Sequence, residues 1–389
     1  MIVKLKIKHY ILLVLFFATM ITSMWGNNIY ILFSAAVASI LFTPSRKGWD
    51  ATSVLLLSFS ILNNLISYTN GRGFDSGFLF LTLLIAPLGM YKFGQWVLLW
   101  LKDEKKRITF LYFAVLLYLL PLFSATAQDI AIVGFVNPAR VFFLDMLNDE
   151  GLAATLYGLM SSVGIGFIAL LFVRSITLKK RLIYILLSIL SVIVVIHLVN
   201  RTGLVIFGVC TVFAAAYYTG IKMSKILPVL FLITFLGVII FYSGIINDDV
   251  IGAYTFRADN ETYSTDDLGG RTEMWSRAIE DMIKYPFGWR SDYYAHNLWL
   301  DIAKFGGWPT FIVFVIATIT FLRRVIYLVR RKATTFSLLA LTVLLSMTMN
   351  AAVEPVIEGS MLFFSLYIMM WGVITALYNE CKCDCKIRR

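Results

Sequence analysis

The polar stretch at residues 244–305 holds the side chains of this chain that are best suited to chemistry. Guanidinium groups form paired, charge-assisted hydrogen bonds with phosphate oxygens, so arginines suit a pyrophosphate. An imidazole titrates near neutral pH and can remove a proton from a sugar hydroxyl. Together these groups predict displacement of a lipid pyrophosphate from a sugar, with the arginines stabilising the leaving charge. The stretch contains His296, which is one of three histidines in the chain, and the arginines Arg257, Arg271, Arg277 and Arg290.

A helix is predicted at residues 271–285, where apolar residues recur on one face before Pro286 ends the pattern. Arg271 falls in its first turn, where the helix dipole favours an anion over a cation, so a ligand-binding role is natural for it. Arg277 follows Glu273 by four residues and can instead form a surface pair. The apolar face should lie against the membrane or the outer ends of other helices. Its residues are Met274, Trp275, Ala278, Ile279, Met282 and Ile283.

Two other connections carry candidate binding residues. In the short turn HLVNRTGLV, His197 and Arg201 are four residues apart, which predicts that they share a helix face. Arg201, at the edge of the hydrocarbon layer, either contacts lipid headgroups or binds an anionic ligand. His197 is a competing candidate for the base, placed deeper in the membrane. Arg140 follows an Asn-Pro turn signal in residues 127–150, a stretch apolar enough to lie in the interface as an amphipathic segment.

The composition indicates an all-α polytopic membrane protein in which these residues are held. Hydrophobic residues make up 59% of the 389 residues and charged residues 15%, far from the composition of a soluble protein. The whole chain, residues 1–389, is predicted to be a single integral membrane domain. A spanning helix needs about 20 mostly apolar residues, and the sequence contains twelve such runs, near 9–25, 28–43, 51–67, 77–101, 108–126, 151–173, 182–199, 203–219, 226–243, 306–322, 335–352 and 360–378.

The basic residues predict the orientation of these spans. Lysines and arginines concentrate in alternate connections, and such connections stay on the cytoplasmic side. Both termini are therefore expected inside, and residues 244–305 form a large outer loop between the ninth and tenth spans. The net charge of +11 follows from this topology. It does not indicate a nucleic-acid partner, and the partner expected from composition is the lipid bilayer.

The sequence contains no convincing metal or cofactor site. The acidic residues between 248 and 267 are dispersed without the spacing of a calcium loop, which favours a solvated surface. The tail cysteines Cys381, Cys383 and Cys385 lie on the reducing side and match no zinc spacing. Metal binding or lipidation of this tail stays open.

The motifs GGRTEMWSRAIEDMIKYPFGW and AHNLWLDIAKFGGWPT, with NRTG upstream, resemble those of the O-antigen polymerase and O-antigen ligase superfamily of Gram-negative bacteria. This resemblance implies a metal-independent, inverting glycosyltransferase in the inner membrane, with its active site facing the periplasm. The implied donor is an undecaprenyl-pyrophosphate-linked saccharide. His296 would activate the acceptor, and Arg201 and Arg271 would bind the pyrophosphate. Arg277 and Gly288 also match an Arg-x10-Gly pattern of some polymerases, but no second copy occurs in the other outer loops.

Three functions are compatible with these features. A polymerase joins lipid-linked repeat units to one another, and it is preferred because no second outer basic patch suits the phosphorylated lipid A core that a ligase needs. A chain-length regulator is a candidate partner of a polymerase. A transporter is the least favoured function, because the charged groups gather in an outer loop and not at the middle of the membrane. The identity of the sugars and the linkage does not follow from the sequence.

Overall fold

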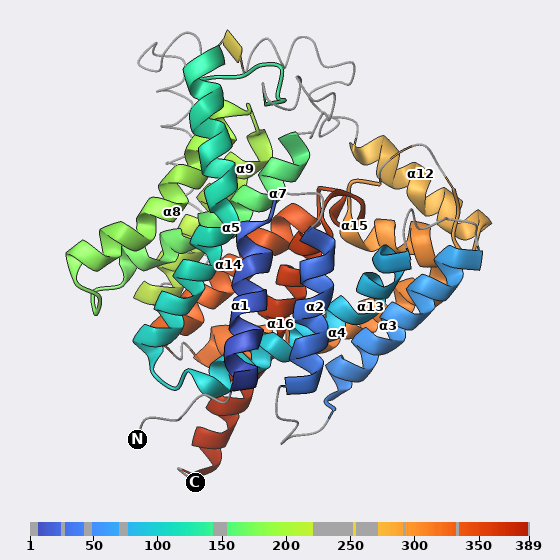
Figure 1. Cartoon of the computed structure of the whole chain (residues 1–389), viewed down its shortest axis with the longest axis horizontal. Helices are drawn as coiled ribbons and strands as arrows, with labels where there is room; N and C mark the ends of the chain where they lie inside the picture. Colours follow the sequence, from blue (N-terminus) through green and yellow to red (C-terminus); the bar gives the residue numbers. More distant parts are fainter. Residues whose placement is uncertain are drawn as a thin grey trace. The chain divides into compact units, whose positions relative to one another are not determined.

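The computed structural model describes residues 7–24, 28–42, 49–69, 77–142, 154–220, 252–253, 271–290, 293, 295–331 and 334–387. Every regular element in these residues is a helix (Figure 1), which confirms the predicted all-α class. The elements are α1 (Ile7–Ile21), α2 (Asn28–Phe42), α3 (Ala51–Thr69), α4 (Gly77–Trp100), α5 (Glu104–Val133), α7 (Ala154–Ile165), the 3₁₀ helix η1 (Gly166–Phe172), α8 (Leu178–His197), α9 (Arg201–Thr219), α12 (Arg271–Lys284), α13 (Leu298–Arg331), α14 (Thr335–Ala351), α15 (Val356–Gly359) and α16 (Met361–Ile387).

Eight of the described helical runs are long and apolar enough to cross a membrane, as expected of a polytopic membrane protein. Three shorter apolar helices, α1, α2 and α14, have 15, 15 and 17 residues. The predicted span at 226–243 lies outside the described residues, so the total of twelve stays a prediction. The eight long runs are α3, α4, α5, α7 with η1, α8, α9, α13 and α16.

Helices α5 and α13 extend well past the spans predicted for them. Helix α5 continues to Val133, so the connection predicted to begin at residue 127 begins later, and its position in the interface stays a prediction. Helix α13 continues to Arg331 and includes the basic residues that were assigned to a connection. Long basic side chains keep their charge in water while their stems cover apolar surface, so a helix can extend past its apolar run.

The first of two compact units contains the described parts of Met1–Pro121, Arg271–Leu341 and Ala351–Arg389. In this unit α4 packs against α2 and α16, and α3 runs beside α13 (Figure 1). The core includes Trp371 of α16, whose ring stacks on Phe321 of α13 with 4.4 Å between the centroids. Both side chains are buried. This packing fixes α13, and α13 begins directly after the segment that carries His296.

The second unit contains the described parts of Leu122–Gly270 and Thr342–Asn350. The span predicted at 151–173 consists of α7 followed by η1, and both pack against α8 and α9. Two polar contacts tie the end of α14 to α7: Ser346 Oγ donates to the Ser162 carbonyl, and Asn350 Nδ2 donates to the Gly158 carbonyl at 2.7 Å. The apolar core of the unit includes Ile165, Ile168, Ile185, Val195, Ile206 and Cys210.

Candidate active site

Arg271 is the first residue of α12, and its side chain contacts the segment that follows α14. Its Nε donates to the Val353 carbonyl oxygen at 2.8 Å, and its Nη2 contacts Oε1 of Glu354 at 2.8 Å. The position in the first turn of a helix was predicted and is confirmed. A helix N-terminus disfavours a cation, and the Glu354 carboxylate supplies the compensating negative charge. About a fifth of the Arg271 side chain stays exposed (20%).

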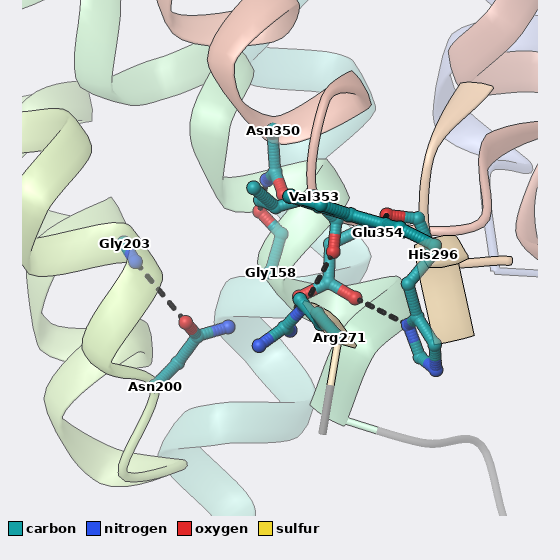
Figure 2. A network of polar contacts seen from close by, with 9 residues as sticks. Gly158, Asn200, Gly203, Arg271, His296, Asn350, Val353 and Glu354 are labelled. Atoms are coloured by element: carbon teal, nitrogen blue, oxygen red, sulfur yellow. Dashed lines mark hydrogen bonds and ion pairs between the residues drawn. The ribbon is translucent and has the colours of Figure 1, made fainter. Parts of the chain in front are cut away.

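His296 precedes α13 with a left-handed backbone, at a φ of 47°. This conformation costs a non-glycine residue roughly 1–3 kcal/mol and is concentrated at functional sites. The Nδ1 atom lies 3.4 Å from Oε2 of Glu354, and 23% of the side chain is exposed. Figure 2 shows Arg271 and His296 approaching Glu354 from two sides.

Glu354 contacts both Arg271 and His296, and the sequence analysis did not identify it as a site residue. Its side chain is only 4% exposed. A carboxylate that is removed from water is stable only when it is paired, and here Arg271 and His296 provide the partners. The available signal was an acidic residue in the sequence AAVEPV, between two apolar helices, where an ionisable group is a functional candidate by default.

The contact with Glu354 suits His296 to act as a base. A carboxylate accepts hydrogen bonds, so Nδ1 donates its hydrogen to Glu354. In this tautomer Nε2 carries the lone pair that can take up a proton. The carboxylate also stabilises the imidazolium that forms, as in other histidine–carboxylate pairs. The arrangement is therefore capable of general-base chemistry next to a guanidinium.

The inner face of α12 packs on the segment around His296. Ala278 and Met282 are buried in one cluster with Trp289, Ala295 and Ala303. These two residues confirm part of the predicted apolar face. Ile279 and Ile283 are 46% and 69% exposed, and their position against the membrane stays a prediction. The apolar residues of a 14-residue helix cover more than one face, and neighbouring protein covers only one of them.

One glycine shapes the connection between α12 and α13, and a second one lies at a kink inside α13. Gly288 has a φ of 93° in the turn after α12, so the glycine of the Arg-x10-Gly pattern has a conformational reason here. Gly307 has a φ of 61°, and a Cβ atom at this position would collide with the backbone of Pro286 and Phe287. The Trp308 N–H donates to the Pro286 carbonyl at 2.8 Å. The sequences PFGW and FGGW therefore contact each other, and this contact holds the turn after α12 against the kink of α13.

Arg277 contacts an aromatic ring and not the residue expected from helical spacing. Its guanidinium lies over the Tyr293 ring, 4.7 Å from the centroid, and the Glu273 pair is not formed. The Tyr293 hydroxyl donates to Asp281 Oδ2 at 2.7 Å. Burial and the neighbouring Asp281 raise the pKa of the Tyr293 phenol. Arg277 therefore belongs to the packing of α12, on the helix that carries Arg271.

The other two loop arginines are Arg290 and Arg257. Arg290 is exposed at the end of the turn that follows α12. Arg257 lies outside the described residues, as do the acidic residues between 248 and 267.

Arg201 occupies the first position of α9 in the second unit. Asn200 caps this helix, because its Oδ1 accepts from the Gly203 N–H at 3.1 Å (Figure 2). A Cβ atom at position 203 would collide with Val195 of α8, so glycine permits the close approach of the two helices. The NRTG motif thus has a local structural role, because it starts α9 with Arg201 at the N-terminus of the helix. A shared pyrophosphate site of Arg201 and Arg271 involves both units and stays a prediction.

The prediction that His197 and Arg201 share a helix face was wrong. Helix α8 ends at His197 and α9 begins at Arg201, with the intervening turn including Val199 at a φ of 50°. Spacing of four residues places side chains together only within one continuous helix. A capping residue between them, Asn200, starts a new helix instead.

His197 is completely buried and is held by residues at the end of α5. Its Nε2 lies 2.7 Å from Asp129 Oδ2, and its Nδ1 lies 2.9 Å from the Phe135 carbonyl oxygen. Asn137 Nδ2 donates to the same Asp129 oxygen at 2.7 Å, and its backbone N–H donates to the His197 carbonyl. Arg140 follows with a φ of 62°, and its N–H donates to the Asn137 carbonyl. The cluster ties the loop after α5 to the end of α8.

Among the residues that the structure describes, no group of three His, Cys, Asp or Glu side chains is placed to hold a metal ion. The C-terminal cysteines lie on α16, which remains helical to Ile387. Cys381 is half-buried, Cys383 is exposed, and neither is in a disulfide. Alternate residues of a helix point to different sides, so these two do not converge on one ion.

No protein-family model matches this chain, and no curated protein matches it in a sequence search.

Proposed function

We propose that this chain is a membrane glycosyltransferase that uses a polyprenyl-pyrophosphate-linked saccharide, and specifically an O-antigen polymerase of a Gram-negative inner membrane. The observation that carries the proposal is the contact of one buried carboxylate, Glu354, with both Arg271 and His296. The shared carboxylate supports the proposal because an imidazole can accept a proton and a guanidinium can bind phosphate. The quoted sequence motifs and the apolar helices support the lipid-linked substrate class.

In the proposed reaction a hydroxyl oxygen of the acceptor attacks the anomeric carbon of the donor sugar. The bond between that carbon and the pyrophosphate oxygen breaks, and undecaprenyl pyrophosphate leaves with the electron pair. His296 Nε2 accepts the hydroxyl proton, and Glu354 stabilises the imidazolium. A single displacement of this kind inverts the configuration at the anomeric carbon. No general acid is needed, because pyrophosphate is already a good leaving group.

Arg271 would bind the pyrophosphate while it remains in contact with Glu354. A guanidinium has five N–H donors in a fixed plane, so it can contact a carboxylate and phosphate oxygens at once. The partial exposure of its side chain permits such an approach. Arg201 would provide a second guanidinium from another outer turn. The loop of residues 244–305 and the turn that carries Arg201 would both face the periplasm, where the donor is displayed.

The proposal is tested with purified protein in nanodiscs and an undecaprenyl-pyrophosphate-linked repeat unit as both donor and acceptor. A polymerase forms longer lipid-linked chains, releases undecaprenyl pyrophosphate and keeps its turnover in EDTA. Chain growth only when lipid A core is added would instead assign a ligase. Absence of transfer to either acceptor would reject the proposed function, and loss of turnover in EDTA with recovery in Mg²⁺ would reject its metal independence.

A deletion strain provides the matching test in cells. Loss of a polymerase leaves a single repeat unit on the lipid A core, whereas loss of a ligase leaves unmodified core and polymer on the carrier lipid. An unchanged lipopolysaccharide pattern would contradict both assignments.

A further inference from the structure

Trp275 lies one helical turn after Arg271 on α12 and contacts the backbone of His296. Its indole Nε1 donates to the His296 carbonyl oxygen at 3.3 Å. Residues four apart on an α-helix share a face. The face of α12 that directs Arg271 toward Glu354 therefore also directs Trp275 toward His296. The Trp275 ring is half-buried, as expected of a side chain that packs on the protein and keeps its N–H on a specific partner.

The chain is also fixed on both sides of His296. Ala295 is completely buried in the cluster with Ala278 and Met282 of α12. Asn297 Nδ2 donates to the Ala352 carbonyl at 2.9 Å, and its Oδ1 accepts from the first N–H groups of α13. Contacts before, at and after position 296 thus come from α12 and from the segment that leads to Glu354.

We propose that Trp275 is a positioning residue for His296, with its indole N–H holding the left-handed peptide that directs the imidazole toward Glu354. A non-glycine residue keeps a left-handed backbone only where its surroundings enforce it. The accessible side-chain rotamers depend on the backbone dihedrals. Release of the His296 carbonyl therefore changes where Nδ1 points. This inference rests on the proposed function and names the residue that orients its base.

The direct test is Trp275→Phe, which keeps an aromatic ring and removes the N–H. The matched control is Trp299→Phe on α13, which removes an indole N–H that also donates at 3.3 Å, to Thr318 Oγ1. We expect the kcat of Trp275→Phe to fall about 3- to 10-fold, the size of one lost hydrogen bond. The donor KM should stay unchanged because Arg271 is intact. Trp299→Phe should keep the wild-type kcat.

A double-mutant cycle separates positioning from a general structural effect. If Trp275 acts through His296, Trp275→Phe causes no further loss of turnover in the His296→Ala background. A loss that persists in full in that background, or one that appears in the donor KM, overturns the inference.

A spectroscopic measurement tests the same inference without enzymatic turnover. The chain has three histidines, so ¹⁵N-histidine labelling gives three imidazole signals that single His→Gln variants assign. Trp275→Phe should move the His296 signal and leave those of His9 and His197 in place. An unmoved His296 signal overturns the inference. A moved signal in a protein that transfers no sugar upholds the positioning role and rejects the proposed function.

Discussion

A histidine–carboxylate pair lies in each of the two units, and the two pairs differ in burial and in how the carboxylate is shared. The His197–Asp129 pair has a 2.7 Å contact, and its side chains are 0% and 2% exposed. Both ring nitrogens of His197 face oxygen atoms, since the second contacts the Phe135 carbonyl. The His296–Glu354 pair is longer, at 3.4 Å, and the histidine is 23% exposed.

The difference in burial and contacts indicates which of the two imidazoles could exchange a proton with a substrate. A carbonyl oxygen only accepts, so Nδ1 of His197 carries a hydrogen, and Nε2 is directed at a carboxylate. Such an imidazole has no accessible atom with which to take a proton from a substrate. His296 has a partly exposed ring, and its carboxylate also contacts a phosphate-binding candidate, Arg271. We therefore interpret the first pair as structural and the second as functional.

The largest expected effect comes from removing each imidazole. General-base assistance contributes about 10²- to 10⁴-fold, so His296→Ala should lose that much turnover while it still binds the donor. His197→Ala should instead lose stability, by about 3–5 kcal/mol, because the buried Asp129 carboxylate loses its ion-pair partner. Turnover, donor binding and thermal unfolding of both variants check this comparison. A stable His197→Ala protein without turnover, beside an active His296→Ala protein, would reverse the assignment.

Glu354→Gln removes the shared charge with little change in shape. Charge-assisted hydrogen bonds contribute about 1.5–3 kcal/mol, so we expect turnover to fall roughly 10- to 10²-fold. The control is Glu273→Gln, which changes an exposed carboxylate in the first turn of the same helix. Steady-state kinetics of the two variants decide the point. Equal turnover in Glu354→Gln and wild type would show that this carboxylate only stabilises the fold.

Arg271→Lys gives a smaller expected effect, because the charge remains and only the planar fork is lost. Turnover should fall about 10-fold, and the same change at Arg201 should act similarly if both guanidiniums bind the pyrophosphate. Arg107→Lys is the matched control, because Arg107 contacts both oxygens of Glu380, at 2.9 and 2.7 Å, in a pair that has no proposed role in the reaction. Turnover measured over a range of donor concentrations would give both the fall in turnover and the change in donor affinity. Normal donor affinity in both Arg271→Lys and Arg201→Lys would remove the pyrophosphate role.

The sequence by itself determined the helical class, the start of α12 and the identity of the chemical side chains. Helical periodicity, an N-terminal helix position and a capping asparagine are local features, since they depend on residues within one or two turns. For this reason Arg271 and Arg201 were correctly expected near helix or turn boundaries. The same local reasoning failed at His197, where spacing alone did not show that one helix ends and another begins.

Only the tertiary structure decided which carboxylate meets which histidine. Glu354 lies 58 residues after His296, and Asp129 lies 68 residues before His197. The pairing follows from how long apolar helices pack, and in a sequence that is apolar on most helix faces no local pattern specifies that packing. The left-handed backbone of His296 likewise depends on contacts from α12 and from residues 352–354. Burial, and with it the separation of a structural histidine from a chemical one, is a property of that packing and not of residue type.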